Sequence, residues 1–139
     1  MIASDIMTPN PVALAATSTV RQAVRLLETL EVRHLPVVDE EGTLVGMVSD
    51  RDLRGLTLPA FSEGEHVGQV RTALDASIAD IMTGGVVSAD VETDVEEIVS
   101  LMLENRIGAV PIVDGDGALV GIVSYVDVLR ETFAPEAAA

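Results

Sequence analysis

Apolar residues recur at helical spacing early in the chain, and short apolar runs follow them. The first stretch has apolar residues at Val20, Ala23, Val24, Leu27 and Leu30. This 3.6-residue period predicts an amphipathic helix. Thr19 and Gln22 have the spacing of a capping box and mark its start.

Two extended runs come next and predict a hairpin. Leu35–Asp39 and Leu44–Val48 are apolar and rich in valine, and the turn between them, Glu40–Gly42, contains glycine. Ser49 ends the second run, and a short helix is predicted at Asp50–Gly55. Val12–Ala16, before the first helix, is predicted to be extended, since Pro9 and Pro11 exclude a helix there.

The same pattern occurs twice. A shift of 75 residues aligns Ser4–Arg54 with Ala79–Leu129 without a gap, and 18 of the 51 aligned positions are identical. The second copy predicts a helix with apolar residues at Val95, Ile98, Val99 and Met102 and a capping box at Thr93 and Glu96. It also predicts a hairpin from Val110–Asp114 and Leu119–Val123 around Gly115–Gly117, and a helix at Tyr125–Phe133. The chain is therefore an internal duplication of one supersecondary unit.

The duplication defines the expected organisation. Each copy reads strand, helix, strand, strand, helix, which predicts an α+β fold. Repeat 1 spans residues 1–55, a connector spans 56–77, repeat 2 spans 78–133, and residues 134–139 form a frayed tail. The connector is expected to contain some helix near Val67–Leu74. Because a unit of about 55 residues is near the lower limit for a stable core, the repeats are expected to pack together as a pseudo-two-fold pair.

Composition and charge narrow the classes of function. The chain is 48% hydrophobic with only three aromatic residues, and its net charge is −15. Such acidity disfavours binding to nucleic acid and to anionic lipid. There is no cysteine and no apolar run long enough for a membrane helix. Residues 1–7 belong to the repeat and do not resemble a signal peptide. We therefore expect a soluble cytoplasmic protein.

The strongest chemical motif is Ser-x-x-Asp at the start of the last helix of each copy, at Ser49–Asp52 and Ser124–Asp127. The spacing fits a capping box, which is a purely structural role. It also fits a ligand site, because helix-start amides and a serine hydroxyl bind phosphate. The aspartate carboxylate, in turn, accepts hydrogen bonds from both hydroxyls of a ribose. The two roles are compatible.

The doubled unit resembles the tandem CBS-domain pair. The resemblance is carried by Asp-Ile-Met-Thr at 5–8 and 80–83 and by Gly-Met-Val-Ser-Asp-Arg-Asp at 46–52. It covers nearly the whole chain except the connector and tail, and the chain looks like a stand-alone pair. The resemblance implies a regulatory module that binds AMP, ADP, ATP or S-adenosylmethionine in clefts between the repeats. It also implies a homodimer that acts on an unknown regulated protein.

The resemblance further implies two sets of nucleotide-binding residues. In the first cleft, the residues that would face Ser124 and Asp127 are Thr8, Val12, Ala13, Val32 and His34. In the second, the residues that would face Ser49 and Asp52 are Thr83, Val87, Ser88, Ile107 and Ala109, with Arg51 as a source of positive charge. His34 by itself also fits a structural histidine beside a strand, and Arg51 also fits a solvated side chain.

The remaining motifs restrict the chemistry. Few cations are available to an incoming phosphate, which disfavours ATP and leaves AMP or the cationic S-adenosylmethionine easier to accommodate. Asp114–Gly117 lacks the later ligands of a calcium loop, so we expect no metal site and no cofactor. No nucleophile–base pair is apparent, and we expect a non-enzyme. The alternative to a ligand sensor is a ligand-free dimerisation module.

Gly46 and Gly121 lie in the middle of predicted strands. Glycine weakens a strand and marks the close approach of another group. In the CBS family that group can be the ligand.

Overall fold

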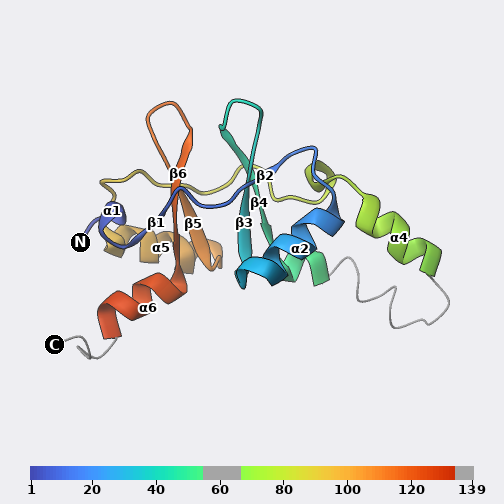
Figure 1. The fold of residues 1–139 in the computed structure, drawn as a ribbon. Helices are drawn as coiled ribbons and strands as arrows, with labels where there is room; N and C mark the ends of the chain where they lie inside the picture. The colour runs from blue at the N-terminus through green and yellow to red at the C-terminus, as the bar shows by residue number, and fades with distance from the viewer. Residues whose placement is uncertain (55–66, 134–139) are drawn as a thin grey trace. The chain divides into compact units, whose positions relative to one another are not determined.

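The computed structural model describes residues 1–54 and 67–133, which form two compact units. Unit 1 comprises Met1–Pro11 and Val87–Ala139, and unit 2 comprises Val12–Val86. Each unit contains a three-stranded sheet (Figure 1). The mixture of helices and small sheets confirms the predicted α+β class. The predicted tail, 134–139, residue 55 at the end of repeat 1 and residues 56–66 of the connector lie outside the described residues.

Unit 2 is built around strands β2 (Leu14–Ala15), β3 (His34–Val38) and β4 (Leu44–Ser49). β2 runs parallel to β3, and β3 and β4 form the predicted antiparallel hairpin. Helix α2 (Val20–Leu30) contacts β3, and residues 50–54 are helical. α4 (Val67–Asp75), which confirms the helix expected in the connector, and the 3₁₀ turn η1 (Ile78–Asp80) complete the unit.

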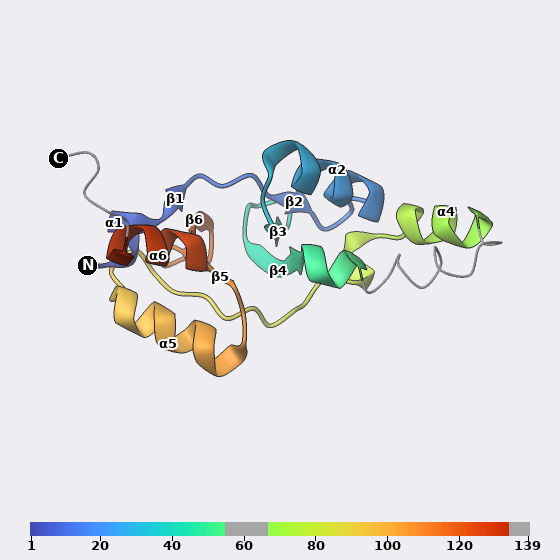
Figure 2. The same ribbon diagram turned by 90° about the horizontal axis from the view of Figure 1, so that it is seen from below.

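Unit 1 contains the corresponding hairpin but a different third strand. Strands β1 (Thr8–Pro9), β6 (Leu119–Ser124) and β5 (Ala109–Val113) form an antiparallel sheet in that order. Helices α1 (Ala3–Ile6), α5 (Val95–Asn105) and α6 (Tyr125–Phe133) accompany it. Figure 2 shows α6 and α5 as separate helices beside the strands of this unit. The strand expected at the start of repeat 2 is reduced to one bridge, Ala89 to Ile112.

The compact units do not coincide with the sequence repeats, because each repeat contributes its first segment to the other unit. In unit 1, the Ala3 N–H donates to the Thr93 carbonyl at 2.8 Å. In unit 2, the Ile78 N–H donates to the Ser18 carbonyl at 2.7 Å. Residues 78 and 18 are the repeat equivalents of residues 3 and 93, so the two bonds correspond. The first eleven residues therefore complete the core of the second repeat.

The two cores use equivalent positions. The core of unit 2 consists of Leu14, Val20, Ala23, Leu27, Leu35, Val37, Val48, Leu53 and Ile78. The core of unit 1 consists of Ala3, Ile6, Val95, Ile98, Met102, Val110, Ile112 and Val123. Burial of these aliphatic side chains is the main force that holds each unit together. Leu30, predicted to belong to the apolar stripe of α2, is 39% exposed.

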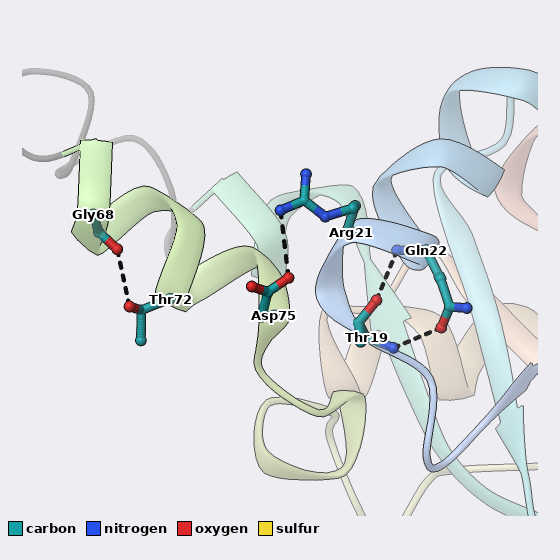
Figure 3. A network of polar contacts seen from close by, with 6 residues as sticks. All are labelled: Thr19, Arg21, Gln22, Gly68, Thr72 and Asp75. Carbon is teal, nitrogen blue, oxygen red and sulfur yellow. Dashed lines mark hydrogen bonds and ion pairs between the residues drawn. The ribbon is translucent and has the colours of Figure 1, made fainter.

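The two long helices begin differently. Thr19 caps α2 as predicted: the Gln22 N–H donates to its hydroxyl, and the Thr19 N–H donates to the Gln22 side chain (Figure 3). The same figure shows the exposed ion pair of Arg21 with Asp75, which links α2 to α4.

The capping box predicted at Thr93 and Glu96 is wrong. The N-cap of α5 is Asp94, the equivalent of Thr19 in the repeat, and it makes no side-chain capping bond. The Thr93 hydroxyl accepts a hydrogen bond from the Asp90 N–H instead. The register of the repeat identifies this N-cap correctly, whereas the Thr-x-x-Glu pattern does not.

The mid-strand glycines are explained by methionine packing. A Cβ on Gly46 would clash with the Met82 sulfur and lie 2.9 Å from its Cγ. A Cβ on Gly121 would clash with the Met7 sulfur in the same way. The expectation that these glycines make room for a ligand is therefore corrected. The methionine of each Asp-Ile-Met-Thr segment occupies that space, which fixes the segment on β4 or β6.

Candidate functional site

In unit 1, Ser124 and Asp127 form a tightly bonded cap at the junction of β6 and α6. The Ser124 N–H and hydroxyl both donate to Asp127 Oδ2, at 2.9 and 3.0 Å. The Asp127 N–H donates back to the Ser124 hydroxyl at 3.2 Å. Asp127 Oδ1 lies 3.5 Å from Nη1 of Arg130, and the Asp127 side chain is only 13% exposed. These contacts hold the carboxylate in one orientation.

In unit 2, Ser49 and Asp52 form the equivalent cap with fewer bonds. The Ser49 N–H donates to Asp52 Oδ2 at 3.0 Å, and the Asp52 N–H donates to the Ser49 hydroxyl at 3.1 Å. Asp52 is an exposed residue. Both motifs therefore have the structural role that the sequence allowed, and in each the cap uses the Oδ2 atom of the aspartate.

A further backbone bond anchors each helix start to the residue that precedes the neighbouring strand. The Tyr125 N–H donates to the Gly108 carbonyl at 2.9 Å, and the Asp50 N–H donates to the Arg33 carbonyl at 2.8 Å. Amides at the start of a helix normally lack a helical partner. Because at least three of them are satisfied here in each unit, the carboxylate, rather than the helix-start amides, is the better candidate for ligand contact.

The residues beside the two caps differ. His34 pairs with Ser49 across β3 and β4, and Ala109 pairs with Ser124 at the same position in β5 and β6. His34 is half-buried, and burial lowers the pKa of its imidazole below 6.5. The carboxylates of Asp52 and Asp50 oppose that shift, and Arg33 adds to it. The imidazole is therefore mainly neutral at pH 7.

The structure brings the predicted site residues into two groups. Unit 1 contains Thr8, Val87, Ser88, Ile107, Ala109, Ser124 and Asp127. Unit 2 contains Val12, Ala13, Val32, His34, Ser49, Arg51, Asp52 and Thr83.

Only part of each predicted cleft therefore lies in one unit. Thr8 pairs with Ile122, two residues before Ser124, and Thr83 pairs with Met47, two residues before Ser49. Arg51 lies in the same unit as Asp52, and the other residues predicted to face each Ser-x-x-Asp cap belong to the other unit. Their place opposite that cap, including that of His34 opposite Asp127, stays a prediction.

Arg130 is a neighbour of the candidate site that the sequence reasoning missed. Its guanidinium lies beside Asp127 Oδ1 because the two residues are three positions apart on α6. The Asp-x-x-Arg spacing was the available signal. The equivalent pair in unit 2 is different, since Arg54 lies 3.1 Å from Asp50 rather than beside Asp52.

Within residues 1–54 and 67–133, no three His, Asp or Glu side chains are arranged to hold a metal ion. None of the helices described there has the length and apolar character that a membrane crossing requires.

Comparison with known proteins gives a consistent family assignment. The model of the CBS domain matches residues 3–58 and 78–133. Inosine-5'-monophosphate dehydrogenase from Methanocaldococcus jannaschii is 31% identical over 136 residues. That match covers 98% of this chain and 24% of the dehydrogenase. The chain therefore spans about a quarter of that relative, so the similarity is confined to one part of the enzyme.

Solved structures of related proteins share the fold of nearly the whole chain. The crystal structure of CBSX2 in complex with AMP is 32% identical, with a TM-score of 0.78, and the match covers 94% of each chain. The CBS domain pair of MJ0100, in complex with 5'-methylthioadenosine and S-adenosyl-L-methionine, is 27% identical. Its TM-score is 0.77, with 94% of this chain and 98% of the other covered. Both relatives were crystallised with adenosine-containing molecules.

Proposed function

The chain belongs to the CBS-domain family, and we propose that it is a regulatory region that binds an adenosine-containing ligand through its Ser-x-x-Asp caps. The observation that carries this proposal is the Asp127 carboxylate, fixed by two hydrogen bonds from Ser124 through Oδ2 alone. A carboxylate offers about four acceptor positions, so it accepts ribose hydroxyls while the cap stays intact. Preorganisation lowers the cost of ordering the site on binding.

The molecules bound in the related structures support the class of ligand. AMP in CBSX2 and S-adenosyl-L-methionine in the MJ0100 pair share an adenosine group. A carboxylate recognises the ribose of that group and is indifferent to what the 5' position carries. Asp127 therefore suits any of AMP, ADP, ATP and S-adenosylmethionine.

The charge of the chain ranks these ligands. With 23 acidic and 8 basic residues, the net charge is −15. Each additional phosphate therefore meets additional repulsion, which local cations must offset. We expect AMP or the cationic S-adenosylmethionine to bind more tightly than ATP.

The proposed role is regulatory rather than catalytic. Binding shifts a conformational equilibrium only if the ligand has different affinities for the two states. In this role the chain reports the ligand to a regulated protein and leaves the ligand unchanged. A ligand that is consumed on prolonged incubation would contradict this part of the proposal.

Thermal unfolding in the presence of each of the four ligands tests the proposal. At a ligand concentration 100 times Kd, the free energy of unfolding should rise by about 2.7 kcal/mol. Adenine alone, which lacks the ribose, is the matched control and should give a much smaller rise. If none of the four ligands shifts the melting temperature at millimolar concentration, the alternative of a ligand-free interaction module is favoured.

A further inference from the structure

The methionine of each Asp-Ile-Met-Thr segment packs its sulfur against a buried strand glycine. A Cβ on Gly121 would clash with Met7 Sδ and would lie 3.0 Å from its Cγ and 3.3 Å from its Cε. At Gly46 the clash is with Met82 Sδ, and the Thr83 carbonyl oxygen lies 3.2 Å from the Cβ position. Both glycines are buried, whereas both methionine side chains are partly exposed. Each methionine is therefore closely packed on its strand while part of it stays in contact with solvent.

The composition makes methionine the first target of an oxidant. The chain has five methionines and no cysteine. Met47 and Met102 are 9% and 8% exposed, whereas Met1 is 62% exposed and belongs to neither core. Met7 and Met82 have intermediate exposure, and each packs against the core of its own unit. They are the two methionines that combine access to solvent with a packing role.

Oxidation changes the property on which this packing depends. A peroxide converts the flexible, apolar thioether into a sulfoxide, which is polar and chiral and disrupts apolar contacts. On the strand side there is no room for an added oxygen, since even a Cβ on the glycine would clash with the sulfur. The oxygen also attracts water to a contact that is now apolar. The oxidised side chain should therefore leave the strand and loosen the segment that carries it.

The loosened segment bears on ligand binding, and this step rests on the proposed function. Thr8 and Thr83, which belong to the predicted nucleotide-binding residues, directly follow the two methionines. They pair with Ile122 and Met47, each two residues before the serine of a Ser-x-x-Asp cap. Release of a methionine would therefore displace a predicted ligand contact and remove the support of the strand that leads to the cap.

We propose that Met7 and Met82 are oxidation sites through which a peroxide weakens the attachment of the two Asp-Ile-Met-Thr segments and, with it, ligand binding. The sulfur lone pair attacks one oxygen of hydrogen peroxide, the O–O bond breaks, and the leaving hydroxide takes the proton of the transferred hydroxyl to form water. Sulfur loses two electrons and the peroxide gains them. Methionine sulfoxide reductases reverse the step, with a dithiol oxidised to a disulfide and water released.

The two segments should respond unequally. In unit 1 the segment continues as a two-residue strand on β6, and the Asn10 N–H donates to the Val120 carbonyl at 3.1 Å. In unit 2 Thr83 forms one isolated bridge with Met47, and the two glycines that follow it have open space around them. Because fewer contacts remain when the methionine is lost, oxidation should loosen the segment of unit 2 more.

Peptide mass mapping of the full chain during treatment with hydrogen peroxide tests the selectivity. Met1 should be oxidised first, because it is the most exposed, and Met7 and Met82 should follow. Met47 and Met102 should stay reduced until the protein unfolds.

Hydrogen exchange of the oxidised chain without ligand tests the structural effect. The Met47 N–H donates to the Thr83 carbonyl at 3.1 Å, and the Thr83 N–H donates to the Met47 carbonyl at 3.0 Å. Exchange of these two amides should become about 10-fold faster or more, with a smaller change at Asn10. Methionine sulfoxide reductases should restore the slow exchange, and the affinity for AMP or S-adenosylmethionine should fall and recover in parallel.

Matched variants assign the effect to the two sulfurs. Met7→Leu with Met82→Leu keeps apolar groups of similar volume and should abolish the response to peroxide. Met1→Leu is the control and should leave the response unchanged. Met82→Gln, which places a polar group at the same site, should give fast exchange at Thr83 without peroxide.

Three results would overturn the proposal: Met7 and Met82 that stay reduced while Met1 is fully oxidised, oxidation at both that leaves amide exchange unchanged, or a full peroxide response in the double leucine variant. Because the exchange is measured without ligand, a chain that binds no adenosine ligand would refute the proposed function and leave the two oxidation sites standing. A ligand affinity that oxidation does not change would refute the coupling to ligand binding.

Discussion

The cores of units 1 and 2 have large and small side chains at opposite members of one pair of equivalent positions. Unit 2 has Ile78 on the segment it receives and Ala23 on its long helix, whereas unit 1 has Ala3 and Ile98 at the equivalent positions. All four side chains are fully buried. Each core thus combines one large and one small side chain at these two positions, which suits a closely packed interior.

The surfaces of the two units have diverged without such compensation. His34 stands where unit 1 has Ala109, and the charged residues 50, 51 and 54 stand where α6 has apolar ones. The Ser-x-x-Asp caps are retained in both, with more hydrogen bonds at Asp127 than at Asp52. The comparison indicates that the core packing and the two caps are common to both units, while the residues around each cap have diverged.

The largest expected effect comes from breaking the exchanged pair. Ile98→Ala should lower the free energy of unfolding by about 2–5 kcal/mol, because it leaves a cavity in a closely packed core. Adding Ala3→Ile, which reproduces the arrangement of unit 2, should recover most of that loss. Urea unfolding of the single and double variants measures both.

The control for this pair is Ala3→Ile alone, which should destabilise by about 1–3 kcal/mol through overpacking. If the double variant loses as much stability as the two single variants together, residues 3 and 98 do not compensate each other. The segment 1–11 would then not be packed as described.

A smaller effect is expected from the pH dependence of His34. Its pKa in the folded protein is lowered below 6.5 by burial, so the unfolded chain binds the proton more readily. As the pH falls through 6.5, protonation therefore favours unfolding, until the pH reaches the folded pKa. Wild type should lose stability relative to His34→Gln over that window, and the difference should be constant at higher pH.

Denaturant unfolding of both proteins on each side of pH 6.5 measures this difference, because carboxylate titrations are common to both. Ala109, the equivalent residue in unit 1, contributes no such titration. A difference that grows in favour of wild type at acid pH would mean that Asp52 and Asp50 dominate over burial.

Much of the fold could be predicted because the pattern is local and occurs twice. The helix at Val20–Leu30, both hairpins and the last helix follow from apolar periodicity and turn residues. The exchange of first segments could not be predicted, since nothing in Asp5–Thr8 indicates whether it docks on its own repeat or on the other. The packing of Met7 against Gly121 could not be predicted for the same reason, because the two residues are more than a hundred positions apart in the sequence.

The candidate site was predictable in its motif but not in its surroundings. Ser124 and Asp127 are close in sequence, so their spacing alone indicates the cap that the structure contains. The strand partner of each serine, His34 or Ala109, depends on hairpin register, and the register shifts between Val37 and Val38 and between Ile112 and Val113. Which residues of the other unit approach each cap depends on packing between units, and that part stays a prediction.

Isothermal titration of wild type, Asp127→Ala and Asp52→Ala with AMP and S-adenosylmethionine tests the central claim most directly. Wild type should bind at least one of these ligands, and Asp127→Ala should lose most of that affinity while its apo stability falls by only about 1–2 kcal/mol, the size of a lost cap. Asp52→Ala should lose less, because its carboxylate is exposed and held by fewer hydrogen bonds. Undiminished binding by Asp127→Ala, or no binding by wild type, would contradict the claim that these caps recognise a ribose.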